Sequence, residues 1–440
     1  MPNWNRQKTL ALLRQYECRN ITYIDPDGSW PIVWKRARGV FVWDSAGKKY
    51  LDLTAGFGVA ATGHANLRVV RAGRQQMGEL LHAMGDVHPH ALKARLAREL
   101  SRLTFERWGR SAASAQRTGL RGKAIFCNSG FEAVEASLKS ALLATGKPGV
   151  IAFHGAYHGT GYGALNTTHR RHFRSPFLSQ LGRFGSFVEF PKSEDRLDAV
   201  KSTLQSLLRR RSIGAILVEP IQGRGGINVP PPAFLPLLRR LCDQFGALLI
   251  LDEIYTGFGR TGRWFACEHS RTVPDLICLG KALSGGFPIS ACVGRADLMD
   301  AAWPSSNGEA IHTSTFLGHP VGCAMALAQI QEIRQRHLVK ESAELGKVLL
   351  ETLARVKSTP RLLLSARGAG LMAGLELRLP KGRPATARTL QTIKGMLQKG
   401  FVLLPEGEHA NVISFTPPLI ISPAQLEHTV DALNAILRGI

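Results

Sequence analysis

The sequence contains no apolar run long enough to span a membrane, and the apolar segment within residues 1–13 is too short for a signal peptide. It also lacks the Cys-x-x-Cys spacing of common metal and redox motifs, although it has seven cysteines. Several of these cysteines lie inside apolar runs, as buried reduced thiols do. We therefore expect a cytoplasmic protein with no membrane contact and no metal site.

Acidic residues are scarce. The chain has 33 aspartates and glutamates against 56 lysines and arginines, which gives a formal net charge of +23. A charge of this size attracts polyanions, so a basic nucleic-acid-binding protein is a remote alternative. The basic residues are mostly scattered, with local concentrations at residues 169–174 and 209–211, and zinc-finger spacing and RNP-like aromatic motifs are absent. We expect an arginine-rich solvated surface and no specific nucleic-acid partner.

The hydrophobic pattern divides the chain into three regions. Residues 40–53 alternate apolar and polar side chains, which is typical of a β-hairpin. From residue 66 to residue 325, short β-rich runs alternate with helical stretches, which predicts a mostly parallel sheet covered on both faces. The pattern predicts an α/β protein and divides the chain into an N-terminal segment (1–65), a large middle domain (66–325) and a C-terminal region (326–440).

The C-terminal region has a mixed pattern that ends in a helix. Strands are expected at residues 371–377 and 412–415. The last helix is expected to start at Ser422, where the serine can cap, the next residue is proline, and Gln425 can complete a capping box. Its apolar stripe consists of Leu426, Val430, Leu433 and Leu437. The one low-complexity segment, residues 111–115, is expected to be a surface loop.

Five apolar segments of the middle region are each followed by polar residues. The segments span residues 124–127, 150–153, 215–218, 247–251 and 276–279. The residues that follow them are, in order, Asn128-Ser129-Gly130, His154, Glu219, Asp252 and Gly280-Lys281. In open parallel sheets, ligands bind beyond the carboxyl ends of the strands, because the connecting loops converge there. We therefore expect these polar residues to lie at one edge of the sheet.

The first of these junctions has the features of a helix start. Ser129 and Glu132 have capping-box spacing, so a helix is expected to begin at about Gly130. Its predicted apolar stripe consists of Val134, Leu138, Ala141 and Leu142. The free amides and positive dipole end of this helix would suit a phosphate, and Gly130 would let it approach the backbone. On its own, a strand–glycine–helix segment is equally compatible with a structural turn.

Asp252 and Lys281 both follow apolar runs, where an unpaired charge is costly. Asp252 could form a buried ion pair with an arginine, or it could bind a basic nitrogen of a ligand. Burial of Lys281 would lower the pKa of its ammonium group and make a neutral, nucleophilic amine accessible. A ligand with a phosphate, an aldehyde for the lysine and a basic nitrogen for the aspartate would satisfy all three positions. Pyridoxal 5'-phosphate (PLP) is such a ligand.

Five sequence blocks resemble the class III aminotransferases in order and spacing. They are NSGFEAVE at 128–135, VEPIQG at 218–223, LDEIYTGFGRTG at 251–262, LGKALSGGFP at 279–288 and TSTFLGHP at 313–320. The resemblance extends from about Val40 to the carboxyl terminus. It implies a PLP-dependent transferase of fold type I, with a large α/β domain and a small domain built from both chain ends, residues 1–65 and 326–440. It also implies a homodimer, or a higher oligomer, whose active sites lie at the subunit interface.

The resemblance also assigns roles to individual residues. Lys281 would form the Schiff base with PLP, Asp252 would hold the pyridine nitrogen, and Glu219 would lie on the substrate side. Tyr157 would stack on the ring, and Thr315 would reach the phosphate of the neighbouring subunit. The remaining implied positions are Ser129, Gly130, Phe131 and Ile254 for the cofactor and Phe57 for the substrate.

Two positions depart from the family pattern near the expected substrate site. Relatives that act on α-amino acids often have an arginine where this chain has Ser414, and a serine cannot clamp a carboxylate in a bidentate manner. Arg224 stands where many relatives have a glutamate. Arg224 could supply the missing carboxylate-binding charge, or it could be a solvent-facing loop residue. Tyr255, two residues after the acidic pair, could hydrogen-bond the hydroxyl of the PLP ring.

These residues predict a transaminase that moves an amino group from an amine or an ω-amino acid to a 2-oxo acid. In the implied mechanism, the protonated ring of PLP acts as an electron sink, and the released Lys281 moves the proton of the substrate carbon. An aminomutase, a racemase or a decarboxylase on the same scaffold is the alternative. Because of Ser414, we expect the reacting amine to lie on a carbon without its own carboxylate.

Overall fold

The computed structural model describes residues 4–110, 120–210 and 212–439. The surface loop expected at residues 111–115 and Arg211 of the basic run lie outside the described residues. Among the residues that are described, every helix is too short or too polar to cross a membrane.

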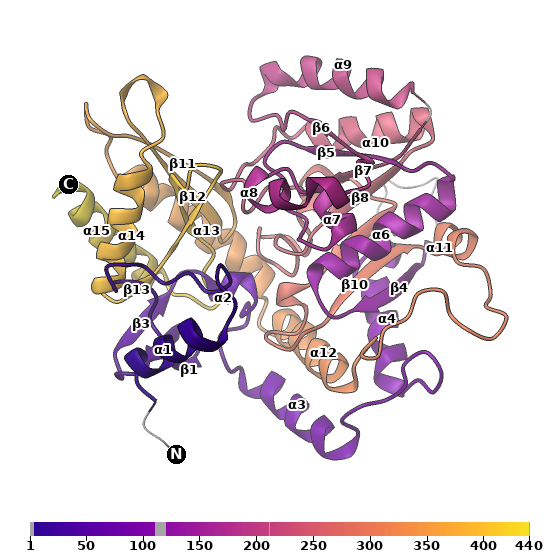
Figure 1. The fold of residues 1–440 in the computed structure, drawn as a ribbon, viewed down its shortest axis with the longest axis horizontal. Helices are drawn as coiled ribbons and strands as arrows, with labels where there is room; N and C mark the ends of the chain where they lie inside the picture. The colour runs from indigo at the N-terminus through magenta and orange to yellow at the C-terminus, as the bar shows by residue number, and fades with distance from the viewer. Residues whose placement is uncertain (1–3, 111–119, 211, 440) are drawn as a thin grey trace.

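A seven-stranded sheet forms the larger lobe, with strand order β4-β10-β9-β8-β7-β5-β6 (Figure 1). β10 is antiparallel to both neighbours, and the other adjacent strands are parallel. The strands are β4 (Gly122–Cys127), β5 (Gly149–Phe153), β6 (Gly185–Val188), β7 (Ile213–Val218), β8 (Leu248–Asp252), β9 (Leu276–Leu279) and β10 (Ser290–Arg295). The five predicted segments are confirmed as β4, β5, β7, β8 and β9. The sequence pattern does not predict β6 and β10, because both begin with small residues whose β propensity is weak.

The α-helices are divided between the two lobes, with α6 and α10 against the large sheet and α1, α14 and α15 in the smaller lobe (Figure 1). Those of the first half are α1 (Arg6–Tyr16), α2 (Ala55–Gly58), α3 (Leu67–Glu79), α4 (Ala91–Leu103), α5 (Phe105–Gly109), α6 (Gly130–Thr145), α7 (Tyr162–Thr167), α8 (Arg171–Arg174) and α9 (Leu197–Leu208). Those of the second half are α10 (Phe234–Phe245), α11 (Ala296–Ala302), α12 (Pro320–Gln335), α13 (Leu338–Ala354), α14 (Thr386–Gln398) and α15 (Pro423–Arg438).

Both faces of the large sheet are buried. Leu217 of β7 belongs to the apolar cluster that contains Val134 of α6. Its neighbour Val218 belongs to the cluster on the other face, together with Leu238 of α10. Since successive side chains point to opposite faces, a strand buried on both sides has a continuous apolar sequence. This burial explains the apolar runs and confirms the predicted α/β fold class.

Helix α6 begins at Gly130, as predicted, but its buried face differs from the predicted stripe. Val134, Leu138 and Ala141 are buried, whereas 46% of Leu142 is exposed. The helix instead buries small residues that the stripe omits, namely Ala133, Ala136, Ser137 and Ser140. These small side chains let the helix pack closely on the sheet, which turns Leu142 away from the core.

The smaller lobe is built from segments near both ends of the described chain, as expected (Figure 1). One of its sheets has the order β1-β2-β3-β13, and the other has the order β11-β12-β15-β14. β13 pairs in parallel with β3, so residues 401–402 extend the sheet of the N-terminal hairpin. The strands are β1 (Trp34–Arg38), β2 (Phe41–Asp44), β3 (Lys49–Asp52), β11 (Leu363–Ala369), β12 (Met372–Arg378), β13 (Phe401–Val402), β14 (Leu404–Glu406) and β15 (Val412–Phe415).

The structure confirms the local predictions for this lobe. The hairpin is formed by β2 and β3, and β12 and β15 correspond to the two predicted strands. The last helix begins after Ser422 with the predicted capping box to Gln425, and its predicted stripe is buried. The domain boundaries after residues 65 and 325 stay predictions, and the second falls within α12.

Candidate active site

A cavity of about 340 Å³ lies beyond the carboxyl ends of strands of the large sheet. Loops that follow β5, β7, β8 and β9 line it, together with the start of α6. The predicted site residues that line it are Phe57, Gly130, Phe131, Tyr157, Glu219, Arg224, Asp252, Ile254 and Lys281. The structure therefore brings together residues that lie far apart in the sequence. His158 and Glu406 also line the cavity and are not predicted from the sequence.

Lys281 lies directly after β9 in a strained backbone conformation. Its φ angle is 37°, a value that side-chain-bearing residues rarely adopt. The Nζ atom lies 4.4 Å from the ring centroid of Tyr255. Burial lowers the pKa of the Lys281 ammonium group, and the carboxyl groups of Asp252 and Glu219 oppose this shift. A neutral amine is thus more accessible at Lys281 than at a surface lysine.

Asp252 ends β8, and two hydrogen-bond donors orient its carboxylate. Its Oδ2 lies 2.8 Å from Nδ1 of His158, and its Oδ1 accepts the backbone N–H of Ile254 at 3.1 Å. Among the described residues, Asp252 forms no ion pair with an arginine, which is the alternative left open by the sequence. The sequence signal for His158 is its position beside Tyr157, in the loop after β5.

The start of α6 carries one buried side-chain oxygen for which the described residues supply no hydrogen-bond partner. Across the described part of the chain, the buried Oγ of Ser129 has no hydrogen-bond partner, although Ser129 and Glu132 stand in the capping-box arrangement. A carboxylate oxygen of Glu132 accepts the backbone N–H groups of Asn128 and Ser129. Gly159 adopts φ 113°, and a Cβ there would lie 2.3 Å from Cβ of Phe131. The loop after β5 therefore comes close to the helix start only because residue 159 is a glycine.

Glu219 follows β7 and is buried near Asp252. Its Oε2 accepts the backbone N–H of Tyr157 at 3.4 Å. Burial, and then the charge of Asp252, raise the pKa of Glu219 well above its ordinary value. The hydroxyl group of Tyr255 lies 3.0 Å from Oγ1 of Thr416, and its contact with the PLP ring stays a prediction. Burial raises the pKa of Tyr255 to about 12, so the phenol stays neutral.

Arg224 extends into the cavity beside Tyr157 and Glu406. Its guanidinium carbon lies 5.2 Å from the ring centroid of Tyr157, and its Nε lies 3.9 Å from Oε2 of Glu406. Glu406, at the end of β14, is only 4% exposed. Burial raises the pKa of Glu406, and the nearby cations Arg224 and Arg170 oppose the shift. Glu406 gives no sequence signal, because a glutamate in a Leu-Pro-Glu-Gly segment looks like a surface turn.

Three predicted residues do not line the cavity. Ser129 lies next to it at the N-cap of α6. Thr315 is exposed on the segment between α11 and α12. Ser414 is 2% exposed within β15, and its hydroxyl donates to the carbonyl of Leu404 at 3.1 Å. Ser414 is therefore not positioned to contact a substrate, because its side chain is used inside the small sheet.

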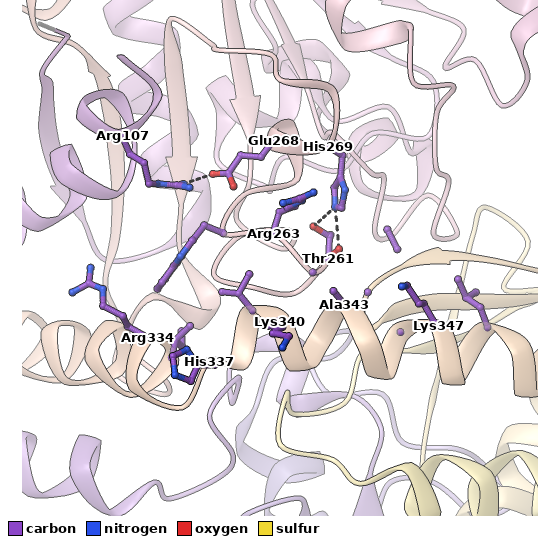
Figure 2. Close-up of a pocket in the computed structure, with 18 residues that line it drawn as sticks. Arg107, Thr261, Arg263, Glu268, His269, Arg334, His337, Lys340, Ala343 and Lys347 are labelled. Atoms are coloured by element: carbon purple, nitrogen blue, oxygen red, sulfur yellow. Dashed lines mark hydrogen bonds and ion pairs between the residues drawn. The ribbon is translucent and has the colours of Figure 1, made fainter. Parts of the chain in front are cut away.

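A separate cavity of about 790 Å³ lies beside α13 and is rich in basic side chains (Figure 2). Arg107 pairs there with Glu268, and His269 lies 2.9 Å from the carbonyl oxygen of Thr261. Its lining shares no residue with the cavity that contains Lys281. In the regions that the structure describes, no group of three or more His, Cys, Asp or Glu side chains could hold a metal ion.

Comparison with known proteins identifies the family. The model of the family described as "Aminotransferase class-III" matches residues 23–437. The chain belongs to the class III aminotransferases. The acetylornithine aminotransferase of Methanosarcina mazei is 35% identical over 407 residues, which cover 92% of each protein. The putrescine aminotransferase of Pectobacterium atrosepticum is 35% identical over 414 residues, which cover 92% of this chain and 82% of that protein. The 5-aminovalerate aminotransferase DavT of Pseudomonas aeruginosa is 35% identical over 409 residues, covering 90% and 91%.

Solved aminotransferase structures have the same fold. The ornithine aminotransferase of Toxoplasma gondii ME49 has a TM-score of 0.83 and 27% identity, covering 98% of this chain and 95% of that chain. The omega transaminase of Pseudomonas jessenii in complex with PMP has a TM-score of 0.87 and 26% identity, covering 98% and 97%. These relatives confirm the predicted family, fold and PLP cofactor. This class III aminotransferase therefore transfers an amino group from an amine donor to a keto-acid acceptor.

The cavity suits PLP on three separate grounds. The unpartnered Oγ of Ser129 and the first amides of α6 suit a phosphate. The oriented carboxylate of Asp252 suits a protonated ring nitrogen. Lys281, with its lowered pKa, suits an aldehyde.

Proposed function

We propose that this aminotransferase uses Lys281, Asp252 and Glu219 as its catalytic residues and acts on primary amines that carry no carboxylate at the reacting carbon. The observation that carries this proposal is the meeting of Lys281, Asp252 and the start of α6 in one cavity. A lysine could lie beside a buried carboxylate merely to balance its charge, but the helix start in the same cavity adds an anion site that charge balance alone does not require.

Each end of PLP would be held by residues of a different element. Ser129, Gly130 and Phe131 would bind the phosphate at the start of α6, where the helix dipole favours an anion. Asp252, oriented by His158, would keep the ring nitrogen protonated. The ring would lie between Tyr157 and Ile254. PLP, when bound, supplies an aldehyde that accepts the amino group and a cationic ring that withdraws electrons.

Lys281 would then act as the base beside the reacting carbon. Its lowered pKa favours the neutral amine, which can accept the proton of that carbon and return it at a neighbouring position. Glu219 lies close to the same space, and its raised pKa favours the protonated carboxyl group over the carboxylate. Glu219 is buried, which strengthens its electrostatic interactions.

Arg224 would receive the carboxylate of the 2-oxo acid. The Arg224 guanidinium lines the cavity that contains Lys281, and its Nε makes no hydrogen bond to any described residue. These features favour carboxylate binding over the solvent-facing alternative. Phe57, which lines the same cavity and is 55% exposed, would contact the carbon chain of the substrate.

The expected donors are terminal amines and ω-amino acids. Three relatives at 35% identity are named for acetylornithine, 5-aminovalerate and putrescine, all of which have an amine remote from another polar group. The absence of an arginine at Ser414 supports the same class, because no bidentate clamp is available there for an α-carboxylate.

The active form would be a homodimer with shared sites, or a higher oligomer. Thr315 would contribute to the phosphate site of the partner, and its exposure is compatible with this role. Ile311 and Phe316 on the same segment are also exposed, which supports a covering partner surface. The molar mass from light scattering tests this assembly.

For the compartment we propose the cytoplasm, because six of the free cysteines are buried thiols, as in proteins from reducing environments.

A panel of donors and acceptors tests the proposed function. Pentylamine, 5-aminopentanoate and L-alanine would each be supplied to the PLP-loaded enzyme, with or without a 2-oxo acid. We expect multiple turnovers with the first two donors only when the 2-oxo acid is present. A strong preference for L-alanine would contradict the proposed donor class, and turnover without an acceptor would contradict transamination.

A further inference from the structure

One oxygen of the buried Glu406 carboxyl group has no hydrogen-bond partner among the described residues. Glu406 is 4% exposed, and its Oε2 accepts no hydrogen bond from any residue that the structure describes. Arg224 is the nearest cation, but 3.9 Å between Nε and Oε2 is beyond hydrogen-bond distance. A buried carboxyl oxygen without a hydrogen-bond donor is costly and requires an explanation, and a ligand that supplies the donor is one such explanation.

Glu406 is held in place next to Arg224 by the main chain. The backbone N–H of Gly407 donates to the carbonyl of Arg224 at 3.1 Å. This bond ties the turn after β14 to the loop after β7. The two side chains therefore occupy fixed neighbouring positions, one of each charge, on the wall of the cavity.

The Arg224–Glu406 pair stands where two cavities meet. The cavity of Lys281 and a neighbouring chamber of about 1070 Å³ share the lining residues Phe57, Arg224 and Glu406. A linear substrate whose amine reaches Lys281 and whose chain extends into the chamber must pass this pair. The distal group of the substrate can then contact either the cation of Arg224 or the carboxylate of Glu406.

The chamber carries more acidic than basic side chains, unlike the chain as a whole. Its described lining contains the carboxylates of Asp25, Asp27 and Glu406 against the cations of Arg224 and Lys394. Lys394 is already paired, because its Nζ lies 2.5 Å from Asp25 and 2.9 Å from Asp27. In a protein of net charge +23, this local balance favours a cationic group over an anionic one.

We propose that Glu406 is a specificity-determining residue that binds a second ammonium group of the donor, so that linear diamines are preferred donors. This inference rests on the proposed function of the same cavity. The two charged residues act in different half-reactions. Glu406 binds the distal ammonium group of the donor, and Arg224 binds the carboxylate of the acceptor.

The test compares two donors that differ only in the distal group. Specificity constants (kcat/KM) are measured for 1,5-diaminopentane and pentylamine with the PLP-loaded wild type and its Glu406→Gln variant. A charge-assisted hydrogen bond contributes about tenfold to a hundredfold. We expect the wild type to prefer the diamine by that factor, mainly through KM, and Glu406→Gln to lose the preference while pentylamine turnover stays within about threefold.

Glu408→Gln is the matched control, because Glu408 lies two residues away but is exposed. This variant should keep the diamine preference. A wild type without the preference overturns the inference even if Glu406→Gln fails to fold, and so does an equal loss for both donors in the variant. Failure of the proposed function is distinguishable, because pentylamine itself would then not be turned over.

Discussion

The Nδ1 atom of His158 lies 2.8 Å from Oδ2 of Asp252, and both side chains are buried. The other oxygen of Asp252 accepts the backbone N–H of Ile254. The carboxylate is thereby fixed in one orientation from two sides. A negative charge held this way can keep a basic ring nitrogen protonated without rearranging, which is the electrostatic role that a PLP enzyme requires.

Replacing the charge while keeping the shape tests this role. We expect Asp252→Asn to retain PLP but to lose turnover by about a hundredfold, because a neutral amide cannot hold the ring proton by charge. Steady-state rates and the cofactor content of the purified protein are the measurements. Asp300→Asn, at an exposed position, is the control. Near-native turnover of Asp252→Asn would refute the assignment.

Lys281→Ala should abolish turnover, with a loss of roughly 10⁴-fold or more, because the general acid–base contribution alone is 10²–10⁴. It should also remove the covalent attachment of PLP. Borohydride reduction followed by peptide mass spectrometry locates the attachment site independently of activity. The exposed Lys123→Ala variant should keep both properties. Finding PLP attached to another lysine in the wild type would rule out Lys281.

The sequence predicts the position of Asp252 and Lys281 well, because each follows an apolar strand that the core buries on both faces. Continuous apolar runs that end in polar residues are strong local signals. Leu142 shows where such signals fail, since periodicity does not reveal which arc of α6 turns toward the sheet. The exposed Leu142 is a consequence of tertiary packing.

Glu406 could not be predicted from its local sequence for a related reason. Its burial depends on the pairing of β14 with β15 and on the contact of the following turn with the Arg224 loop. Ser414 illustrates the converse. The family pattern points to position 414 as a substrate contact, but its hydroxyl is bonded inside the sheet. Contacts between segments that are distant in sequence decide both cases.

Glu253 should make the stability of the protein depend on pH. It is completely buried, and burial raises its pKa from 4.5 to about 7 although Thr256 and two backbone amides donate to it. Between these values the folded chain holds a proton that the unfolded chain has released. The contribution of Glu253 to the free energy of unfolding is therefore fully present below pH 4.5. It is lost as the pH rises to 7, and the total loss is about 3 kcal/mol.

Denaturant unfolding of the wild type and Glu253→Gln across pH 5 to 8 measures this contribution. The amide does not titrate, so the free energy of unfolding of the wild type, relative to the variant, should decline as the pH rises toward 7. A difference in the free energy of unfolding that is constant with pH is expected, because the substitution changes hydrogen bonds. Such a constant difference does not bear on the pKa of Glu253. Parallel pH curves would show that Glu253 has an ordinary pKa.

Arg224→Ala should discriminate between charged and neutral acceptors. Arg224 lines the cavity that contains Lys281, and a partly buried, charge-assisted contact with a carboxylate is worth about 1.5–3 kcal/mol, or tenfold to a hundredfold in kcat/KM. Turnover of pyruvate should fall by that factor, whereas turnover of propanal, which has no carboxylate, should change little. The exposed Arg196→Ala variant should affect neither acceptor. Equal losses for pyruvate and propanal would mean that Arg224 supports the site in another way. In that case the carboxylate must find a different cation, and Arg170 is the next candidate, because its charge also acts on Glu406.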